Sequence, residues 1–281
     1  MENLDVIDSV IRAASYVVLY ATLFLLSKWF KDILTPYKMD EELTKNDNVA
    51  VALAVSGYFF ATGLIFVATL FGPSRGLMND LVSVGGYSLL GLVLLNLSRL
   101  FNDKVLLHKF CNNTQLVQQQ NASVGVVQMG SYIATGLIIA GALTGQGSGP
   151  ITTCVFFVLG QLALLLFARI YARLIPYNIH DELEQNNGAA SVAFGGSLVA
   201  LGIIISNSVA GNFAGWGDSI ASFAMASVLA FLFLPLVRVF MDRLVLPGAN
   251  LSDEIREFNL GAGFLEAVVA IIFATILAFV I

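Results

Sequence analysis

The C-terminal stretch 259-NLGAGFLEAVVAIIFATILAFVI-281 decides the class of fold. It is long enough to cross a bilayer, which takes about 20 apolar residues, and Glu266 is its only charged side chain. Residues spaced by four, three and four positions share one stripe of a helix, and here that stripe carries Asn259, Gly263, Glu266 and Ala270. Because small side chains permit close helix contact, we expect the stripe to face other helices rather than lipid.

The rest of the chain has the same membrane character. Of its 281 residues, 57% are hydrophobic and only 12% are charged, whereas a soluble domain has about 25% charged residues. Residues 110–168 and 185–217 contain no charge at all. In hydrocarbon every backbone amide must be satisfied within the protein, and continuous apolar runs achieve this as helices. The sequence therefore predicts an all-α integral membrane protein.

We expect eight transmembrane helices. We expect no cleavable signal peptide, because the first residues are acidic rather than basic. The predicted spans are Ile7–Phe30, Asn48–Phe71, Leu81–Phe101, Asn121–Leu143, Ile151–Tyr171, Asn187–Val209, Ser219–Phe240 and Asn259–Ile281.

Lysine and arginine indicate the orientation. Twelve of the fourteen lie in, or next to, the connections after spans one, three, five and seven, and only Arg12 and Arg75 lie on the other side. By the positive-inside rule, both termini are expected on the periplasmic side.

The chain also matches itself when it is shifted by about 140 residues. Thr35-Pro36-Tyr37 then falls on Ile175-Pro176-Tyr177, and Gln128 falls near Glu266. Such self-similarity indicates a tandem duplication, with repeats at 1–145 and 146–281. Each repeat has four helices, so both enter the membrane in the same direction and we expect a pseudo-two-fold axis along the membrane normal. We expect spans four and eight, or helices close to them, to line the interface between the repeats.

These features resemble a known family. The Thr-Pro-Tyr-like turn, the helix start Asp47-Asn48-Val-Ala-Val-Ala52, and a late Asn with an acid or amide seven residues on are similar to the YjfL-like inner-membrane proteins. That family carries the domain of unknown function 350 and is also labelled UPF0719-like. The resemblance covers nearly the whole chain, once per half, and implies a multi-pass protein of the bacterial cytoplasmic (inner) membrane.

Glu266 is the strongest candidate for chemistry. A charged carboxylate deep in a bilayer costs several kcal/mol, so it should be protonated, paired or next to a wet cavity. The matching stripe in span four carries Asn121, Gly125, Gln128 and Tyr132. If the two stripes face one another, Glu266 and Gln128 form a proton- or ion-binding site flanked by Asn121 and Asn259. The alternative is that Glu266 and Gln128 only hold helices together through hydrogen bonds.

Polar residues at the span ends offer further candidates. Asp47 and Asn48, with Asn186 and Asn187 at the matching position, either cap their helices or form a cytoplasmic mouth. Asp80 and Asp218 recur at the outer ends of spans three and seven, where they either cap or line an external mouth.

Other groups have simpler explanations. Arg238 and Asp242 have the spacing of an ion pair at a cytoplasmic helix end. His108 and His180 have no second ligand at a suitable spacing, so we expect no metal and no cofactor. No set of nucleophile, base and oxyanion donor can be assembled, so we do not expect an enzyme.

The sequence thus favours proton-linked transport or conduction of a small ion or solute, with Glu266 as the protonation site. The rival hypothesis is a non-catalytic membrane scaffold or accessory subunit that binds a cytoplasmic partner protein. The lipid bilayer is the expected partner in both cases, a homo-oligomer is compatible with the sequence without being required by it, and no nucleic acid is expected.

Overall fold

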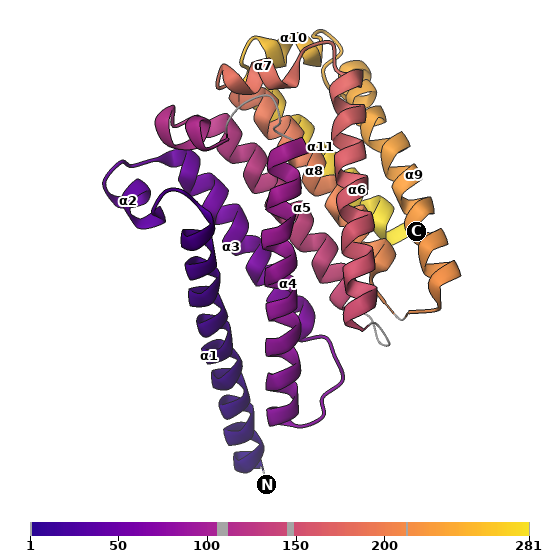
Figure 1. Ribbon diagram of the computed structural model, residues 1–281. Coiled ribbons are helices and arrows are strands. Elements are labelled where there is room, and N and C mark those ends of the chain that lie inside the picture. The colour runs from indigo at the N-terminus through magenta and orange to yellow at the C-terminus, as the bar shows by residue number, and fades with distance from the viewer. Residues whose placement is uncertain (1, 106–111, 145–148, 212, 281) are drawn as a thin grey trace.

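The computed structural model describes residues 2–105, 112–144, 149–211 and 213–280, and all regular structure in these ranges is helical (Figure 1). Within these ranges eight helices are long and apolar enough to cross a membrane, in agreement with the predicted all-α class and eight spans. They are α1 (Glu2–Leu34), α3 (Val49–Thr69), α4 (Leu77–Val105), α5 (Ala122–Leu143), α6 (Pro150–Leu174), α8 (Gly188–Val209), α9 (Trp216–Phe240) and α11 (Leu260–Val280). The boundary that we place between residues 145 and 146 lies outside the described residues.

Short helices connect the long ones at one end of the bundle, which we call the short-helix end. Figure 1 shows α2, α7 and α10 there, and the N-terminus at the opposite end. The connecting elements are α2 (Met39–Thr44), α7 (Ile179–Glu184), α10 (Leu251–Arg256) and two single π-helical turns, η1 (Thr114–Gln118) and η2 (Met241–Val245).

Four of the long helices, α3, α5, α8 and α11, form a row in which each helix packs against the next. The contacts in this central row are close because small residues meet backbone. A methyl group added at Gly125 would collide with the Ala50 carbonyl of α3, and one added at Gly263 would collide with the Ala189 carbonyl of α8. The glycine-rich and alanine-rich sequences of these helices therefore permit backbone-to-backbone packing.

The other four long helices, α1, α4, α6 and α9, pack against the central row. Among the long helices of the described residues, each outer helix comes just before its row helix, with only short elements between them, so these helices form four hairpins, two in each half. Figure 1 shows α4 and α6 in front of the row. The α1 helix is the least covered of the eight: only 6% of its most apolar stretch is buried.

Every row helix begins with the same local structure. The residue before the helix cap adopts a left-handed backbone, with φ of 47° at Asp47, 48° at Gln120, 59° at Asn186 and 63° at Phe258. An asparagine follows in each case, and its side-chain oxygen accepts a backbone N–H three residues later, as Asn48 does from Val51. Asparagine is among the best helix N-caps, so this sequence signal fixes where each row helix begins.

Candidate functional site

Glu266 lies on α11 with 1% of its surface exposed. Its carboxylate Oε1 is 3.4 Å from Nε of Arg238 on α9, and it accepts a hydrogen bond of 3.4 Å from the Tyr171 hydroxyl on α6. Arg238 Nη2 in turn donates to the Tyr177 hydroxyl over 3.3 Å. We call Glu266, Arg238, Tyr171 and Tyr177 the Glu266 cluster. Three long helices and one turn of the second half thus converge on one buried ion pair.

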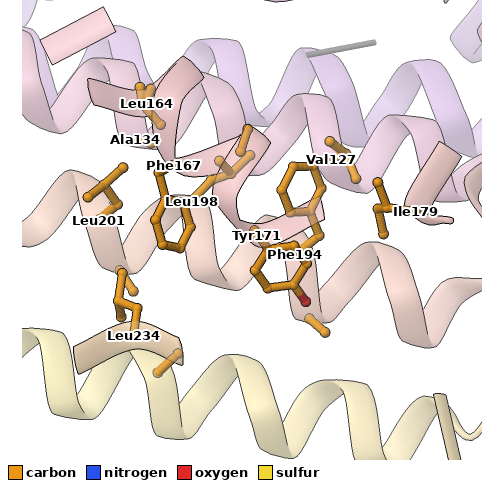
Figure 2. Close-up of a cluster of buried hydrophobic side chains, with 14 of the residues drawn as sticks. Val127, Ala134, Leu164, Phe167, Tyr171, Ile179, Phe194, Leu198, Leu201 and Leu234 are labelled. Carbon is orange, nitrogen blue, oxygen red and sulfur yellow. The ribbon is translucent and has the colours of Figure 1, made fainter. Parts of the chain in front are cut away.

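Aromatic rings surround the cation of this cluster. The Arg238 guanidinium lies 5.8 Å from the centre of the Tyr171 ring and 5.6 Å from that of Tyr177, so cation–π attraction adds to the ion pair. Figure 2 shows Tyr171 beside Phe167, Phe194 and Leu198, in an apolar cluster contributed largely by α6 and α8. Burial raises the pKa of the Tyr177 phenol above its usual range, so this hydroxyl stays protonated at neutral pH.

Two atoms of the Glu266 cluster have unused hydrogen-bonding capacity. Glu266 Oε2 and Arg238 Nη1 are buried and have no hydrogen-bond partner. A buried polar atom without a partner costs about 1–3 kcal/mol, and more where it is charged. The site therefore offers one acceptor that can take a proton and one donor that can bind an acceptor group.

The matching region of the first half has different chemistry. Gln128 is buried there, and no carboxylate takes the place of Glu266. Lys31 of α1 is only 2% exposed and donates to the Tyr132 hydroxyl over 2.8 Å. Its ammonium lies 5.1 Å from the centre of the Tyr58 ring. The duplicated scaffold thus holds a lysine among tyrosines in one half and an ion pair among tyrosines in the other.

The stripes of spans four and eight do not face one another, so the condition for a joint site of Glu266 and Gln128 is not met. Gly125 of the first stripe faces α3, and Gly263 of the second faces α8. The halves meet instead through α5 and α8, where Gly130 lies against the backbone of Gly195. Because α8 packs on α5 with one face and on α11 with another, the partners of Glu266 come from α6 and α9 rather than from α5.

Asn121 and Asn259 are helix caps rather than neighbours of Glu266. The Asn121 amide donates to Gln115 Oε1 and to the Leu183 carbonyl, whereas Asn259 donates to Glu254 Oε2. The two residues belong to the turns that start α5 and α11.

The residues of the predicted cytoplasmic mouth also lie in such turns. Asn48 and Asn187 are buried caps whose amides donate to the carbonyls of Leu116 and Ile255, in the turn before the next row helix. Asn186 accepts from the Ser123 N–H, and Asp47 is exposed. The hydrogen bonds of the asparagines join consecutive turns into a continuous layer at the short-helix end.

Asp80 and Asp218, predicted at an external mouth, each line a cavity at the end of the bundle opposite the short helices. The cavity next to Asp80 has a volume of about 600 Å³, and the one next to Asp218 about 140 Å³. Asp80 is held by the Ser74 hydroxyl at 2.6 Å and by the Arg75 backbone N–H at 2.7 Å.

The partners of Glu266 were not evident from the sequence. Local spacing pairs Arg238 with Asp242, but Asp242 instead accepts from the Leu251 backbone N–H. The available signal was the repeat itself, which aligns Arg238 with Arg99 and Tyr177 with Tyr37. The described residues contain no group of three or more His, Cys, Asp or Glu side chains placed to hold a metal, and His108 lies outside them.

Comparison with known proteins identifies the family of this chain. The model of the Domain of Unknown Function DUF350 matches twice, at residues 5–143 and 146–281. The chain belongs to the DUF350 family. A relative described as a UPF0719 transmembrane protein, from Aquifex aeolicus, is 24% identical over 86% of this chain and 90% of its own length.

A second relative is about half as long as this chain. The UPF0719 inner membrane protein YjfL of Escherichia coli K12 is 31% identical over 41% of this chain and 82% of its own length. No solved structure matches the chain. With two DUF350 copies and eight candidate spans, the chain is a multi-pass inner-membrane protein built on an internal repeat.

Proposed function

We propose that this protein carries out proton-linked transport or conduction of a small ion or solute, with Glu266 as the protonation site. The observation that supports the proposal is the buried pair of Glu266 and Arg238, which keeps Glu266 Oε2 and Arg238 Nη1 free of hydrogen-bond partners. Ionisable residues within membrane spans are costly and commonly mark ion or proton pathways.

The pair suggests how a proton and a solute would be coupled. A proton added at Glu266 Oε2 neutralises the carboxylate and weakens its attraction for Arg238. The guanidinium then needs another acceptor, because a buried charge without a partner is strongly unfavourable. An acceptor group or anion that binds Arg238 would therefore favour protonation of Glu266, and loss of that proton would favour its release.

We further propose that the short-helix end faces the cytoplasm and that both termini face the periplasm. Eleven of the thirteen Lys and Arg among the described residues belong to the short-helix end and the helix ends next to it, which is the expected bias for cytoplasmic connections. Because each repeat has four spans, both repeats would then start on the periplasmic side and lie parallel to one another. The proposal includes no catalytic chemistry and no cofactor.

Infrared difference spectroscopy on the lipid-reconstituted protein tests the protonation site. We expect the carboxyl band of a protonated Glu266 to grow as the pH is lowered and to be lost as the pH is raised, as a site that exchanges protons requires. The band should be absent in Glu266→Gln and retained in Glu257→Gln, which makes the same chemical change at an exposed site before α11. A Glu266 band that stays constant at every pH would contradict the proposal.

Proton flux provides the functional readout. In liposomes with an internal pH-sensitive dye and a potassium diffusion potential, we expect Glu266→Gln to slow proton entry at least tenfold, and Glu257→Gln to leave it unchanged. Full activity in Glu266→Gln would reject the coupling.

A second candidate, a membrane scaffold that binds a cytoplasmic partner, is favoured by a different observation. The central row packs backbone against backbone at Gly125, Gly130 and Gly263, an arrangement suited to a rigid support. On this hypothesis a cytoplasmic protein co-purifies in a fixed ratio, and Glu266→Gln does not alter that ratio.

A further inference from the structure

The larger cavity at the end opposite the short helices is lined by charged and polar residues that have no part in the proposed function. Its volume is about 600 Å³, within the range of small-molecule sites. The ends of α1, α3, α4, α5 and α6 enclose it, and its polar lining includes Arg12, Tyr16, Arg75, Asp80, Tyr87 and Thr153.

The two arginines are the informative part of this lining. Twelve of the fourteen Lys and Arg lie in or next to the connections after spans one, three, five and seven, and Arg12 and Arg75 are the two that do not. They come from α1 and from the turn before α4, 63 positions apart, yet both line the same cavity. Since this end of the chain is otherwise poor in cations, their convergence points to an anionic ligand.

Asp80 does not cancel this charge. Its two oxygens already accept hydrogen bonds from the Ser74 hydroxyl and the Arg75 backbone N–H. Arg12 Nη1 lies 3.5 Å from Asp80 Oδ2 and also donates to the Ser74 hydroxyl over 3.1 Å. Two guanidinium groups and one carboxylate leave the cavity with a net charge of +1. Asp80 thus holds the turn and Arg12 in place, and each guanidinium has five N–H donors to share.

The part of α1 that runs from the cavity toward the short-helix end is suited to lipid. There the apolar side chains Val17, Val18 and Leu25 are each about two-thirds exposed. Tyr16 and Tyr87 line the cavity as well, and tyrosine is enriched at the level of lipid headgroups. A ligand with an anionic head and apolar tails could therefore bind with its head in the cavity and its tails along α1.

We propose that this cavity binds a phosphate group, which Arg12 and Arg75 recognise through charge-assisted hydrogen bonds. Arginine is well suited to phosphate because its planar fork matches phosphate oxygens. The group can belong to a phospholipid headgroup or to a soluble phosphate ester. This inference does not depend on the protonation of Glu266.

The second half supplies an internal comparison. The cavity next to Asp218 has a volume of about 140 Å³ and no Lys or Arg in its lining. The phosphate site is therefore expected in the first half alone.

Native mass spectrometry of the full chain tests the lipid source. We expect the protein to retain phosphatidylglycerol, and the double variant Arg12→Gln/Arg75→Gln to weaken this binding at least tenfold. Arg243→Gln, an exposed arginine at the short-helix end, serves as the matched control and should bind as the parent does. Unchanged thermal unfolding of the double variant shows that it is folded, and Arg12→Lys/Arg75→Lys, which keeps both charges, should recover part of the binding.

Calorimetric titration with inorganic phosphate and glycerol 3-phosphate tests the soluble source. Binding of either one that the double glutamine variant loses supports the site, as does arginine-dependent retention of phosphatidylglycerol alone. If neither lipid nor soluble phosphate binds, or if both bind equally well after the arginines are replaced, the proposal is wrong.

Discussion

Glu266 and Arg238 depend on each other for their stability in the membrane. Each is largely buried, and each is the partner that the other needs. Removal of one member of a buried ion pair costs about 3–5 kcal/mol because it leaves the other charge uncompensated, whereas replacement of both can be nearly neutral.

A double-mutant cycle measures whether the pair is ionised. We expect Arg238→Gln and Glu266→Gln each to lower the free energy of unfolding by about 3 kcal/mol or more. The double variant should lose clearly less than the sum of the two, and thermal unfolding in detergent would show the difference. If Glu266 is permanently protonated, only a hydrogen bond from the charged Arg238 remains, and the coupling should fall to about 1.5–3 kcal/mol.

At the scale of the element, the turns before the row helices carry two kinds of information. The asparagine caps are local and could be identified from the sequence, because a capping side chain and the helix that follows it are neighbours in the chain. The second role of these asparagines could not. The Asn187 amide donates to the Ile255 carbonyl, 68 positions away, and nothing in the local pattern indicates that partner.

Substitution of the capping asparagines measures how much their hydrogen bonds to distant turns contribute to stability. We expect Asn187→Ala to cost about 2–4 kcal/mol, from loss of the cap and of buried hydrogen bonds to Glu182 and Ile255. Asn259→Ala should cost only about 1 kcal/mol, because Asn259 is exposed. Asn187→Ser, which can still cap, should lie between these values. Equal losses of thermal stability at positions 187 and 259 would show that the bonds between turns contribute nothing.

For the whole molecule, the sequence predicted the membrane class, the eight spans and the duplication, because composition and repeats do not depend on which helices touch. It failed on helix neighbours. The stripe that contains Gly125 and Gln128 shows that one face of α5 is buried, but helical periodicity does not say which helix covers that face. The partner of Arg238 was predicted wrongly for a related reason. Local spacing indicated Asp242, four residues away, whereas in the fold Arg238 pairs with the buried carboxylate of Glu266, which is distant in the sequence.

The contact between the two halves gives a prediction at this scale. Gly130 of α5 touches the Gly195 backbone of α8, and a methyl group added there would lie 2.6 Å from the Gly195 carbonyl oxygen. We expect Gly130→Ala to lower the unfolding free energy by about 1–3 kcal/mol, as overpacking usually does. Gly86→Ala is the matched control, since nothing lies near the added methyl group, and it should be neutral or stabilising by up to about 1 kcal/mol. Comparable melting temperatures for the two variants would mean that the halves separate readily.

The central row also has unlike ends. Nine residues after each capping asparagine, α3, α5 and α8 have a glycine, Gly57, Gly130 and Gly196, and each of these meets a neighbouring row helix. At the same position α11 has Val268, which is 49% exposed. A helix that packed on Val268 could not approach α11 as closely as α11 approaches α8, because a branched side chain stands there in place of the glycine of the other row helices.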